Sequence, residues 1–335
     1  MSFGDQKISV AMATCNGEAF LEQQLDSIFS QSVPPDEIVI CDDRSDDGTV
    51  SIAEAWRRRH PGAIRLLRNP VRLGSSRNFE RAISEASGDV IFLADQDDVW
   101  LPGRVEQMCR LLSSPKTTGG VFCDSAVVDR ELRDTGVGHW ECRGFSAAAL
   151  EAARRTDDGV FRLFLKRVPA AGHDMAFRAA LRPLLLPFPA LPECHDTWIG
   201  LLLAALGKWE FTSEKLTLFR QHETNASRSG RRPGWIGQWR EAKRSIRSGT
   251  FAWNAELFRR LIERLGDHPP AETAALLRDR MEHSLTRSAM ACGWLRRLPL
   301  IGREVRNGRY FRYGRGWKSV VQDLLLQGPP GSWTE

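Results

Sequence analysis

The sequence DVIFLADQDD, residues 89–98, joins a short apolar run to a cluster of carboxylates. Residues 89–94 have the length and composition of a buried strand. Asp95, Asp97 and Asp98 follow at once, and their negative charges repel one another unless a cation or basic groups compensate. Oxygen ligands at a strand end suit Mg²⁺ or Mn²⁺. The stretch therefore predicts a divalent metal site, with an acidic loop that binds no metal as the alternative.

The chain before residue 89 alternates strands with helices. Strands are expected at 7–14, 37–41 and 63–68, and helices at 18–31, 49–59 and 75–86. This rhythm predicts an α/β fold with a mostly parallel, Rossmann-like central sheet and helices on both of its faces. Ligands bind at the carboxyl ends of the strands in such sheets.

Polar clusters follow three of these predicted strands, at Thr14–Asn16, Asp42–Asp47 and Asp95–Asp98. Because the carboxyl ends of parallel strands share one edge, we expect the clusters to meet in a ligand site. Asp42 and Asp43 allow two interpretations. An aspartate here could cap the helix that follows, or it could accept a hydrogen bond from a nucleotide base or ribose.

The pattern is less regular beyond residue 99. Helices are expected at 104–112, near 146–155, and at 199–206, 236–265 and 271–290, and strands at 120–123, 209–212 and 216–220. Segment 130–160 is expected to be a mobile loop around its helix, and 227–237 a linker rich in Arg, Ser and Gly.

Two more polar positions are candidates for the site. Asp196, directly after His195, begins an apolar helix, where a carboxylate is either a helix cap or, if it faces the site, a general base for an alcohol. His222 follows a predicted strand and is either structural or an additional metal or phosphate contact.

The charge of the 335-residue chain is uneven. The net charge is +5, yet residues 231–335 alone hold 20 basic and 10 acidic residues and six of the eleven tryptophans. A basic, Trp-rich region fits nucleic acid, an anionic membrane surface or a solvated helical face. No nucleic-acid-binding motif accompanies it, so no nucleic-acid partner is expected.

Seven scattered cysteines include no CxxC pair, which argues against a thiolate metal site or a disulfide framework and fits a reducing compartment. The first residues, MSFGDQKISV, lack the regions of a secretory signal, and no stretch has the apolar length of a spanning helix. We expect a cytoplasmic protein with possible peripheral contact at the inner face of the cell membrane.

Several motifs occur in an order that resembles a known family. They are KISVAMATCNGEAFLEQQLDSIFSQ (7–31), EIVICDDRSDDGT (37–49), RLGSSRNFERAISEASGDVIFLADQDDVWLPGR (72–104), HDTWI (195–199) and FRQHETN (219–225). Together they resemble the family 2 glycosyltransferases with the GT-A fold, most closely the rhamnosyltransferase-like branch that builds bacterial surface polysaccharides such as O-antigen or capsule. The resemblance implies a GT-A catalytic domain over 1–225, followed by a basic, mainly helical region over 226–335.

The resemblance also implies roles for single residues. Asp196 matches the catalytic base of an inverting reaction. The nucleotide-sugar donor, linked to UDP, dTDP or GDP, would be contacted by Thr14, Asn16, Asp43, Asp95 and Asp97. A divalent ion, Mn²⁺ or Mg²⁺, would be held by the DxD-type motif and the closing motif, through Asp97, Asp98 and His222.

The sequence departs from the family pattern at a few positions. Cys15 stands where Tyr is frequent, Arg72 stands where Asn is common, and the QxxRW motif of processive synthases is absent. The last departure favours transfer of one sugar to each acceptor, a saccharide or a lipid-linked oligosaccharide.

Two rival functions are weaker. A nucleotidyltransferase should have a Gly-rich, basic phosphate loop after its first strand, but that position reads ATCNGEAF, residues 13–20, without Lys or Arg. A catalytically inactive GT-A scaffold that docks on membranes through its basic tail is the second alternative. The joint presence of Asp43, Asp95, Asp97 and Asp196 argues against it.

Overall fold

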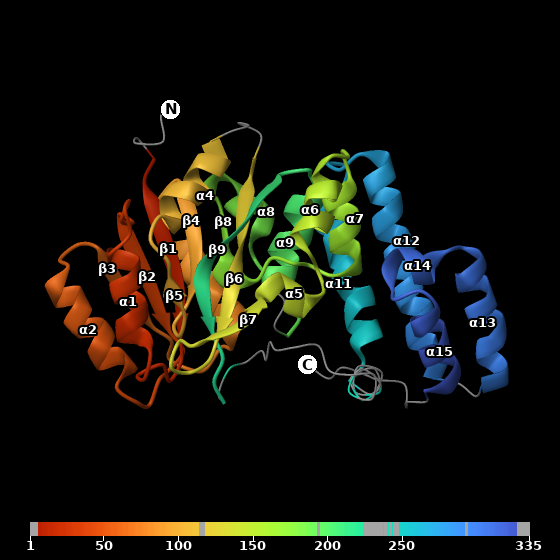
Figure 1. Ribbon diagram of the computed structural model, residues 1–335, viewed down its shortest axis with the longest axis horizontal. Coiled ribbons are helices and arrows are strands. Elements are labelled where there is room, and N and C mark those ends of the chain that lie inside the picture. The colour runs from red at the N-terminus through yellow and green to blue at the C-terminus, as the bar shows by residue number, and fades with distance from the viewer. Residues whose placement is uncertain are drawn as a thin grey trace. The chain divides into compact units, whose positions relative to one another are not determined.

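The computed structural model describes residues 6–113, 118–192, 195–223, 225, 237, 240, 243, 248–291 and 294–326. It divides into two compact units (Figure 1). The first comprises Met1–Val160, Pro169–Phe188 and Glu193–Gly230, and the second Phe161–Val168, Pro189–Pro192 and Arg231–Glu335.

A nine-stranded sheet forms the centre of the first unit. Its strands run in the order β3-β2-β1-β4-β8-β6-β9-β5, and β7 pairs with β6. The first four strands are parallel: β1 (Ile8–Thr14), β2 (Glu37–Asp42), β3 (Ile64–Arg68) and β4 (Val90–Asp95). The predicted mostly parallel α/β fold is therefore confirmed, and each of these four strands lies within one residue of its expected bounds.

Helices cover both faces of the sheet. On one face, α1 (Leu21–Phe29), α2 (Thr49–Arg59) and α4 (Arg104–Ser113) share a hydrophobic core with the strands. The opposite face packs against α3 (Ser75–Glu85), which contacts both β1 and β2 and, beyond them, α9 (His195–Ala205). The first four of these helices match the predicted ones closely, although α1 begins three residues later than expected. α9 begins four residues before the predicted helix at 199–206.

The late start of α1 has a local cause. The main-chain N–H groups of Phe20 and Leu21 both donate to the carbonyl oxygen of Gly17, 3.0 Å in each case, and close a turn before the helix. The helix then buries Leu21, Leu25 and Ile28 on one face. This spacing is that of an amphipathic helix facing a core.

The second half of the sheet differs from the prediction. β6 (Gly120–Val128) is longer than the expected strand at 120–123, and β9 (Trp209–Arg220) is one strand instead of a pair. The polar centre of β9, residues 212–215, suggests a turn in the sequence. In the structure these residues continue the strand, and their pairing with β6 is irregular. Three strands were not predicted, β5 (Val99–Trp100), β7 (Asp134–Gly138) and β8 (Met175–Arg178). β8 enters the sheet antiparallel between β4 and β6.

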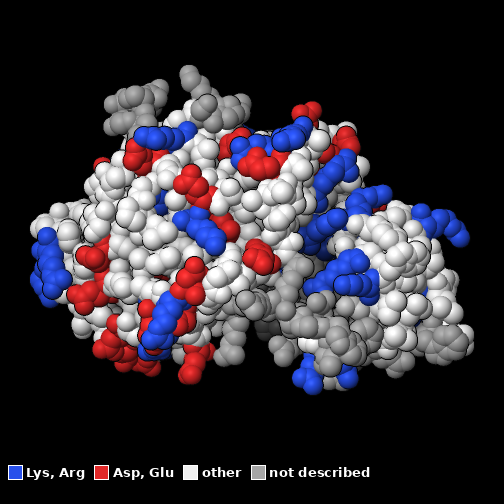
Figure 2. All heavy atoms as spheres, viewed as in Figure 1, with Lys and Arg blue, Asp and Glu red and all other residues white. Residues whose placement is uncertain are grey.

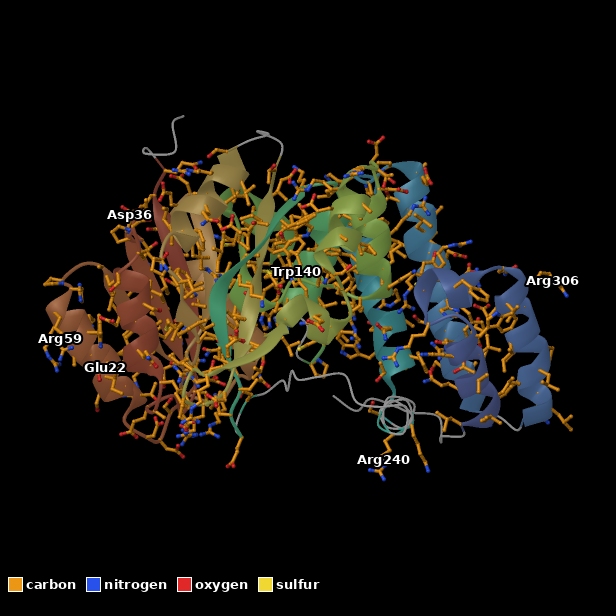
Figure 3. All side chains as sticks on the ribbon, viewed as in Figure 1. Glu22, Asp36, Arg59, Trp140, Arg240 and Arg306 are labelled. Carbon is orange, nitrogen blue, oxygen red and sulfur yellow. The ribbon has the colours of Figure 1, made fainter. Side chains whose placement is uncertain are left out.

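Segment 130–160 is not the single mobile loop that we expected. It contains β7 (Asp134–Gly138), α5 (His139–Arg143) and the predicted helix, here α6 (Ala147–Arg154), and it ends at the start of α7 (Gly159–Lys166). Trp140 of α5, labelled in Figure 3, is almost completely buried and packs against Phe122 of β6 at 5.6 Å between ring centroids. Aromatic packing of this kind holds the segment against the sheet.

The second unit is helical where it is described. It contains most of α7 together with α11 (Thr250–Leu265), α12 (Ala271–Ser288), α13 (Trp294–Arg306), α14 (Arg309–Tyr313) and α15 (Trp317–Leu325). α12 matches the expected helix at 271–290, and α11 the second half of the one at 236–265. The expected linker at 227–237 lies outside the described residues except for its last position. Among the described helices, none combines the length and the apolar composition needed to cross a membrane.

Candidate active site

Three polar loops leave the sheet at one level. In the strand register Thr14 of β1 pairs with Asp42 of β2, and Ala13 of β1 pairs with Asp95 of β4. The loops after β1, β2 and β4 therefore begin side by side at the carboxyl edge, as the sequence predicted. Asp36, labelled in Figure 3, precedes β2 and lies at the opposite edge.

Side chains of neighbouring loops hold the loop after β1. The amide of Gln96 binds both main-chain groups of Cys15: Nε2 donates to the carbonyl oxygen (2.9 Å), and Oε1 accepts from the N–H (2.8 Å). Asn16, with a positive φ of 52°, accepts from the N–H of Asp46 through Oδ1 (3.0 Å). A Cβ at Gly17 would lie 2.2 Å from Oε1 of Gln96, so this close approach requires glycine.

Asp43 organises the loop that precedes α3. Its carboxylate accepts from the N–H of Leu73 (2.7 Å), the N–H of Gly74 (2.9 Å) and Nδ2 of Asn69 (2.8 Å), and the residue is almost completely buried. The expected contact with a nucleotide base would add to these three bonds. The hydroxyl of Thr14 is also buried and donates to Asp42 (3.2 Å).

In the loop after β2, Asp47 directly precedes Gly48, which is the N-cap of α2 and makes no side-chain capping bond. Oδ1 of Asp47 accepts from the N–H of Thr49 at 3.0 Å, where α2 begins. Through Oδ2 it also accepts from the N–H of Glu18 (3.1 Å) and so links this loop to the one after β1. Asp42 and Asp43 are therefore not needed as caps for α2.

A cavity of about 500 Å³ opens beside these loops. Its lining residues are Arg44, Ser45, Asp46, Arg68 and Arg72. Three guanidinium groups against one carboxylate give the cavity a positive character that favours an anion such as a phosphate group. In the sequence Arg72 stood out only as a departure from the family pattern, and Arg44 and Arg68 were missed because arginines in polar loops carry no distinctive spacing.

The three acids after β4 point in different directions. Asp98 is completely buried, accepts from the main-chain N–H of Arg220 through Oδ1 (3.1 Å), and finds no hydrogen-bond donor for Oδ2 among the described residues. Burial raises the pKa of Asp98 well above its usual range, and the neighbouring Asp97 and Asp95 add to this effect. Asp95 is partly exposed.

Asp97 forms a pair with a histidine from the end of β9. Oδ2 of Asp97 lies 2.9 Å from Nε2 of His222, whose ring packs against Phe20 at 4.6 Å between centroids. The main-chain oxygen of Asp97 accepts from Nε of Arg220 (2.8 Å). The structure thus brings together Asp97 and His222, two of the predicted metal ligands.

His173 lies between the other two acids. Its Nδ1 is 3.6 Å from Oδ2 of Asp95 and 4.0 Å from Oδ2 of Asp98, and its ring stacks on Phe219 at 4.3 Å. Burial by itself lowers the pKa of His173, but the Asp174 and Asp98 carboxylates outweigh it and raise this pKa well above its usual value. The neighbouring carboxylates therefore favour the protonated form of His173.

A second buried cluster contacts His173 through Nε2 of its ring. Oδ2 of Asp174 lies 3.2 Å from Nε2 of His173 and 3.4 Å from Nδ1 of His139, and Ser125 donates to Oδ1 of Asp174. Although burial opposes ionisation, the two histidines hold the pKa of Asp174 far below its usual range. Nη2 of Arg104 donates to the carbonyl oxygen of His173 (2.6 Å) and fixes its main chain.

Two residue sets at this edge could hold a divalent ion. Ligand atoms of Asp95, Asp98 and His173 lie within 4.8 Å of one another, and Asp97 with His222 forms the neighbouring pair. Carboxylates, an imidazole and the orphaned Oδ2 of Asp98 fit a hard cation such as Mn²⁺ or Mg²⁺. Sequence reasoning missed His173, because a Gly-His-Asp stretch without periodic neighbours gives no signal of its position.

Asp196 lies in the first turn of α9. Its Oδ1 accepts from the N–H of Thr197 (2.6 Å), and its Oδ2 is 4.0 Å from Nη1 of Arg143. The preceding His195 stacks on Phe79 and lies against Gly172, where a Cβ would be 2.8 Å from Nε2. The first turn of α9 thus lies beside the turn that carries His173, and both the capping and the catalytic interpretations of Asp196 fit this position.

This geometry agrees with the comparison with known proteins. Residues 9–178, half of the chain, match the profile of Glycosyl transferase family 2. The chain belongs to this family. The matched region contains all three polar loops and the cluster around His173, and the predicted family resemblance is confirmed.

Curated proteins that are similar to this chain include two bacterial transferases. The dTDP-rhamnosyl transferase RfbG of Shigella flexneri is 36% identical over 99 residues, which cover 28% of this chain and 34% of that protein. The abequosyltransferase RfbV of Salmonella typhimurium is 38% identical over 93 residues, 27% of this chain and 28% of that protein. The chain thus spans about a third of each of these relatives.

Solved structures agree in fold. TarS of S. aureus in complex with UDP-GlcNAc has a TM-score of 0.57 at 16% identity, over 84% of this chain and 72% of that one. The mannosyltransferase PcManGT of Pyrobaculum calidifontis, in complex with GDP-Man and Mn²⁺, has a TM-score of 0.50 at 19% identity, over 95% of this chain and 84% of that one. These identities show the fold alone, which is the predicted GT-A fold.

Proposed function

We propose that this chain transfers one sugar from a nucleotide-sugar donor to an acceptor hydroxyl, with inversion at the anomeric carbon and with help from a divalent ion. The observation that carries the proposal is the meeting of Asp95, Asp98 and His173 within 4.8 Å, next to the Asp97–His222 pair, in a family 2 glycosyltransferase domain. We further propose that the first compact unit is the catalytic domain and that the acceptor belongs to bacterial surface-polysaccharide synthesis.

The donor would occupy the carboxyl edge of the sheet. The cavity between Arg44, Arg68 and Arg72 has the charge for the diphosphate or a neighbouring phosphate oxygen, and Asp43 and Asn16 hold the loops that surround it. UDP, GDP and dTDP donors all present a diphosphate. A donor screen is therefore needed to identify which nucleotide the donor carries.

Asp196 would act as the general base. Its carboxylate takes the proton from the acceptor hydroxyl as that oxygen forms a bond to the anomeric carbon, and the bond from this carbon to the diphosphate oxygen breaks with its electron pair. A divalent ion, when bound, supplies positive charge for the departing diphosphate. Asp95, Asp97, Asp98, His173 and His222 are the residues that would hold it.

The test is nucleoside diphosphate release from UDP-, GDP- and dTDP-sugars, with Mn²⁺ and with EDTA. We expect release from one nucleotide class, its loss with EDTA, and its loss in Asp196→Asn while the donor still binds in calorimetry. Turnover that survives full chelation would refute the metal part of the proposal. Donor binding without release, with lipid-linked saccharide acceptors supplied, would favour the alternative of an inactive GT-A scaffold.

The second unit would bring the enzyme to its acceptor. Residues 231–335 carry twice as many basic as acidic residues, so we propose peripheral contact with an anionic membrane that presents a lipid-linked acceptor. A helical brace with a solvated basic face is the alternative for this region.

A further inference from the structure

One helix of the second unit exposes its apolar side. On α15 the exposed large residues are Trp317, Val321, Leu324 and Leu325, at spacings i, i+4, i+7 and i+8, and Trp317 is 63% exposed. The buried residues of the same helix include Ser319 and Asp323. A surface helix of a globular protein normally buries its apolar stripe, but of the large apolar residues of α15 only Val320 is buried.

α13 continues this exposed surface. Leu295 and Leu298 are 66% and 43% exposed, one helical turn apart. The buried Arg297 between them donates through Nη1 to the carbonyl oxygens of Asp323 (3.0 Å) and Leu326 (2.7 Å). The first turn of α13 therefore lies beside the last turn of α15.

The two helices run antiparallel. Ile301, further along α13, shares a hydrophobic cluster with Val320, nearer the start of α15. On each helix the exposed apolar residues are offset from the buried Ile301 or Val320 by roughly 40 to 140° in the same rotational sense, at 3.6 residues per turn. In an antiparallel pair such rows lie on the same side. We name this surface the apolar face, formed by Leu295, Leu298, Trp317, Val321, Leu324 and Leu325.

Trp317 is held in place on the apolar face. Its ring meets Phe311 of α14 edge-on, with 5.4 Å between centroids, and Phe311 is also exposed. Aromatic pairs of this geometry are favourable beyond their buried area. The side chain thus keeps a fixed position while most of its surface faces solvent.

The charges on the helices that carry the apolar face are mainly basic. Within 294–326 there are two acids, Glu304 and Asp323, and both are buried against basic or tyrosine partners. Six basic residues of this segment are exposed: Arg296, Arg303, Arg306, Arg312, Arg315 and Lys318. Two of them have acidic partners, Glu304 for Arg303 and Asp279 of α12 for Arg312. Arg306 projects outward from α13 in Figure 3, and the side of these helices seen in Figure 2 carries blue residues at its edges and little red.

We propose that the apolar face docks on an anionic lipid bilayer, with α13 and α15 lying in the interface. Tryptophan favours the headgroup region, aliphatic side chains enter the acyl boundary, and basic side chains bind anionic headgroups. A second copy of this chain fits the face poorly, because it would bring two sets of basic side chains together. The inference rests on the proposed function for its purpose, since a lipid-linked acceptor would lie at such a surface.

The experiment is co-sedimentation of the full chain with vesicles of phosphatidylcholine alone and with added phosphatidylglycerol. We expect binding to the anionic vesicles that weakens as salt is raised. The variant Trp317→Ser with Leu325→Ser should lower the partition coefficient about tenfold or more. Its matched control is Leu285→Ser, an exposed leucine on α12 outside the face, which should bind like the wild type.

A double variant that reverses two basic charges tests the electrostatic part of the proposal. Arg296→Glu with Lys318→Glu should lower binding about 25-fold or more, from about fivefold for each basic side chain, whereas Arg58→Glu on α2 should have no effect. Absence of vesicle binding, or equal binding by the apolar-face variants, overturns the proposal. So does a wild-type dimer in sedimentation velocity that Trp317→Ser converts to a monomer without any vesicle binding.

Failure of the proposed function would be separate from these outcomes. Donor turnover with a soluble acceptor is measured without vesicles, and the variant with Trp317→Ser and Leu325→Ser should retain it. A chain that binds vesicles but turns over no donor keeps this inference and loses the transferase proposal. Circular dichroism melting of each variant confirms that the exposed substitutions leave the fold intact.

Discussion

Asp124 of β6 makes the stability of the first unit depend on pH. Its Oδ1 accepts from the main-chain N–H groups of Trp140 and Ser125, both at 2.9 Å, and the side chain is buried. Burial raises the pKa of Asp124 to about 6, even though these two bonds lower it. A carboxylate of an unfolded chain has a pKa of about 3.9.

The raised pKa of Asp124 decides whether the protein gains or loses stability as the pH rises. The folded state binds this proton more tightly than the unfolded state, so the contribution is most favourable at low pH and is lost as the pH rises from about 4 to about 6. A difference of about two pKa units corresponds to about 3 kcal/mol at neutral pH. In Asp124→Asn the amide oxygen can still accept from Trp140 and Ser125, while the buried charge is removed.

The assay is urea unfolding of wild type and Asp124→Asn at several pH values. The free energy of unfolding of the variant, relative to wild type, should rise by about 2 kcal/mol between pH 4.5 and pH 7.5. The control is Glu131→Gln, an exposed acid in the turn after β6, which should stay within about 0.5 kcal/mol of wild type throughout. A pH-independent difference for Asp124→Asn would refute the reasoning.

Three further substitutions test the site. Asp97→Asn should weaken Mn²⁺ binding in calorimetry about tenfold or more without loss of stability, because it removes one of three crowded charges; unchanged Mn²⁺ affinity would remove Asp97 from the ligand set. Asp196→Asn should lower kcat by about 10² or more and leave donor affinity unchanged; an equal loss of both would place Asp196 in the donor pocket or the framework. Asp174→Asn should cost about 3–5 kcal/mol at neutral pH, because it leaves the buried imidazolium of His173 without its main partner; a change below about 1 kcal/mol in urea unfolding would show that this pair is not ionic. The cost should shrink as the pH falls below about 4, where the unfolded carboxylate takes up its proton.

The first half of the fold was predictable from local pattern. Apolar runs such as 7–14 and 89–94 are short, uninterrupted and bounded by polar loops, which leaves a buried parallel strand as the simplest interpretation. The rule that strand ends share one edge then placed the loops after Thr14, Asp42 and Asp95 together, as the register shows. This part of the site needed no knowledge of side-chain positions.

The second half was less predictable because its pairing is long-range. β8, residues 175–178, is four residues long, and only its neighbours β4 and β6 make it a strand. β9 has a polar centre that reads as a turn, and its pairing with β6 decides otherwise. His173 lies two residues before the start of β8. Its position near the acids could therefore not be predicted from the sequence.

The position of His173 explains how three acids can share one strand end. The completely buried Asp98 has a carboxylate oxygen without a donor among the described residues, with Asp95 and Asp97 close by, and such a group is costly unless a positive charge compensates. His173 is placed to provide that charge, because the Asp174 and Asp98 carboxylates raise the pKa of its imidazole. A divalent ion that enters the site would meet carboxylates already held in place, with a histidine that gives up its proton if it becomes a ligand.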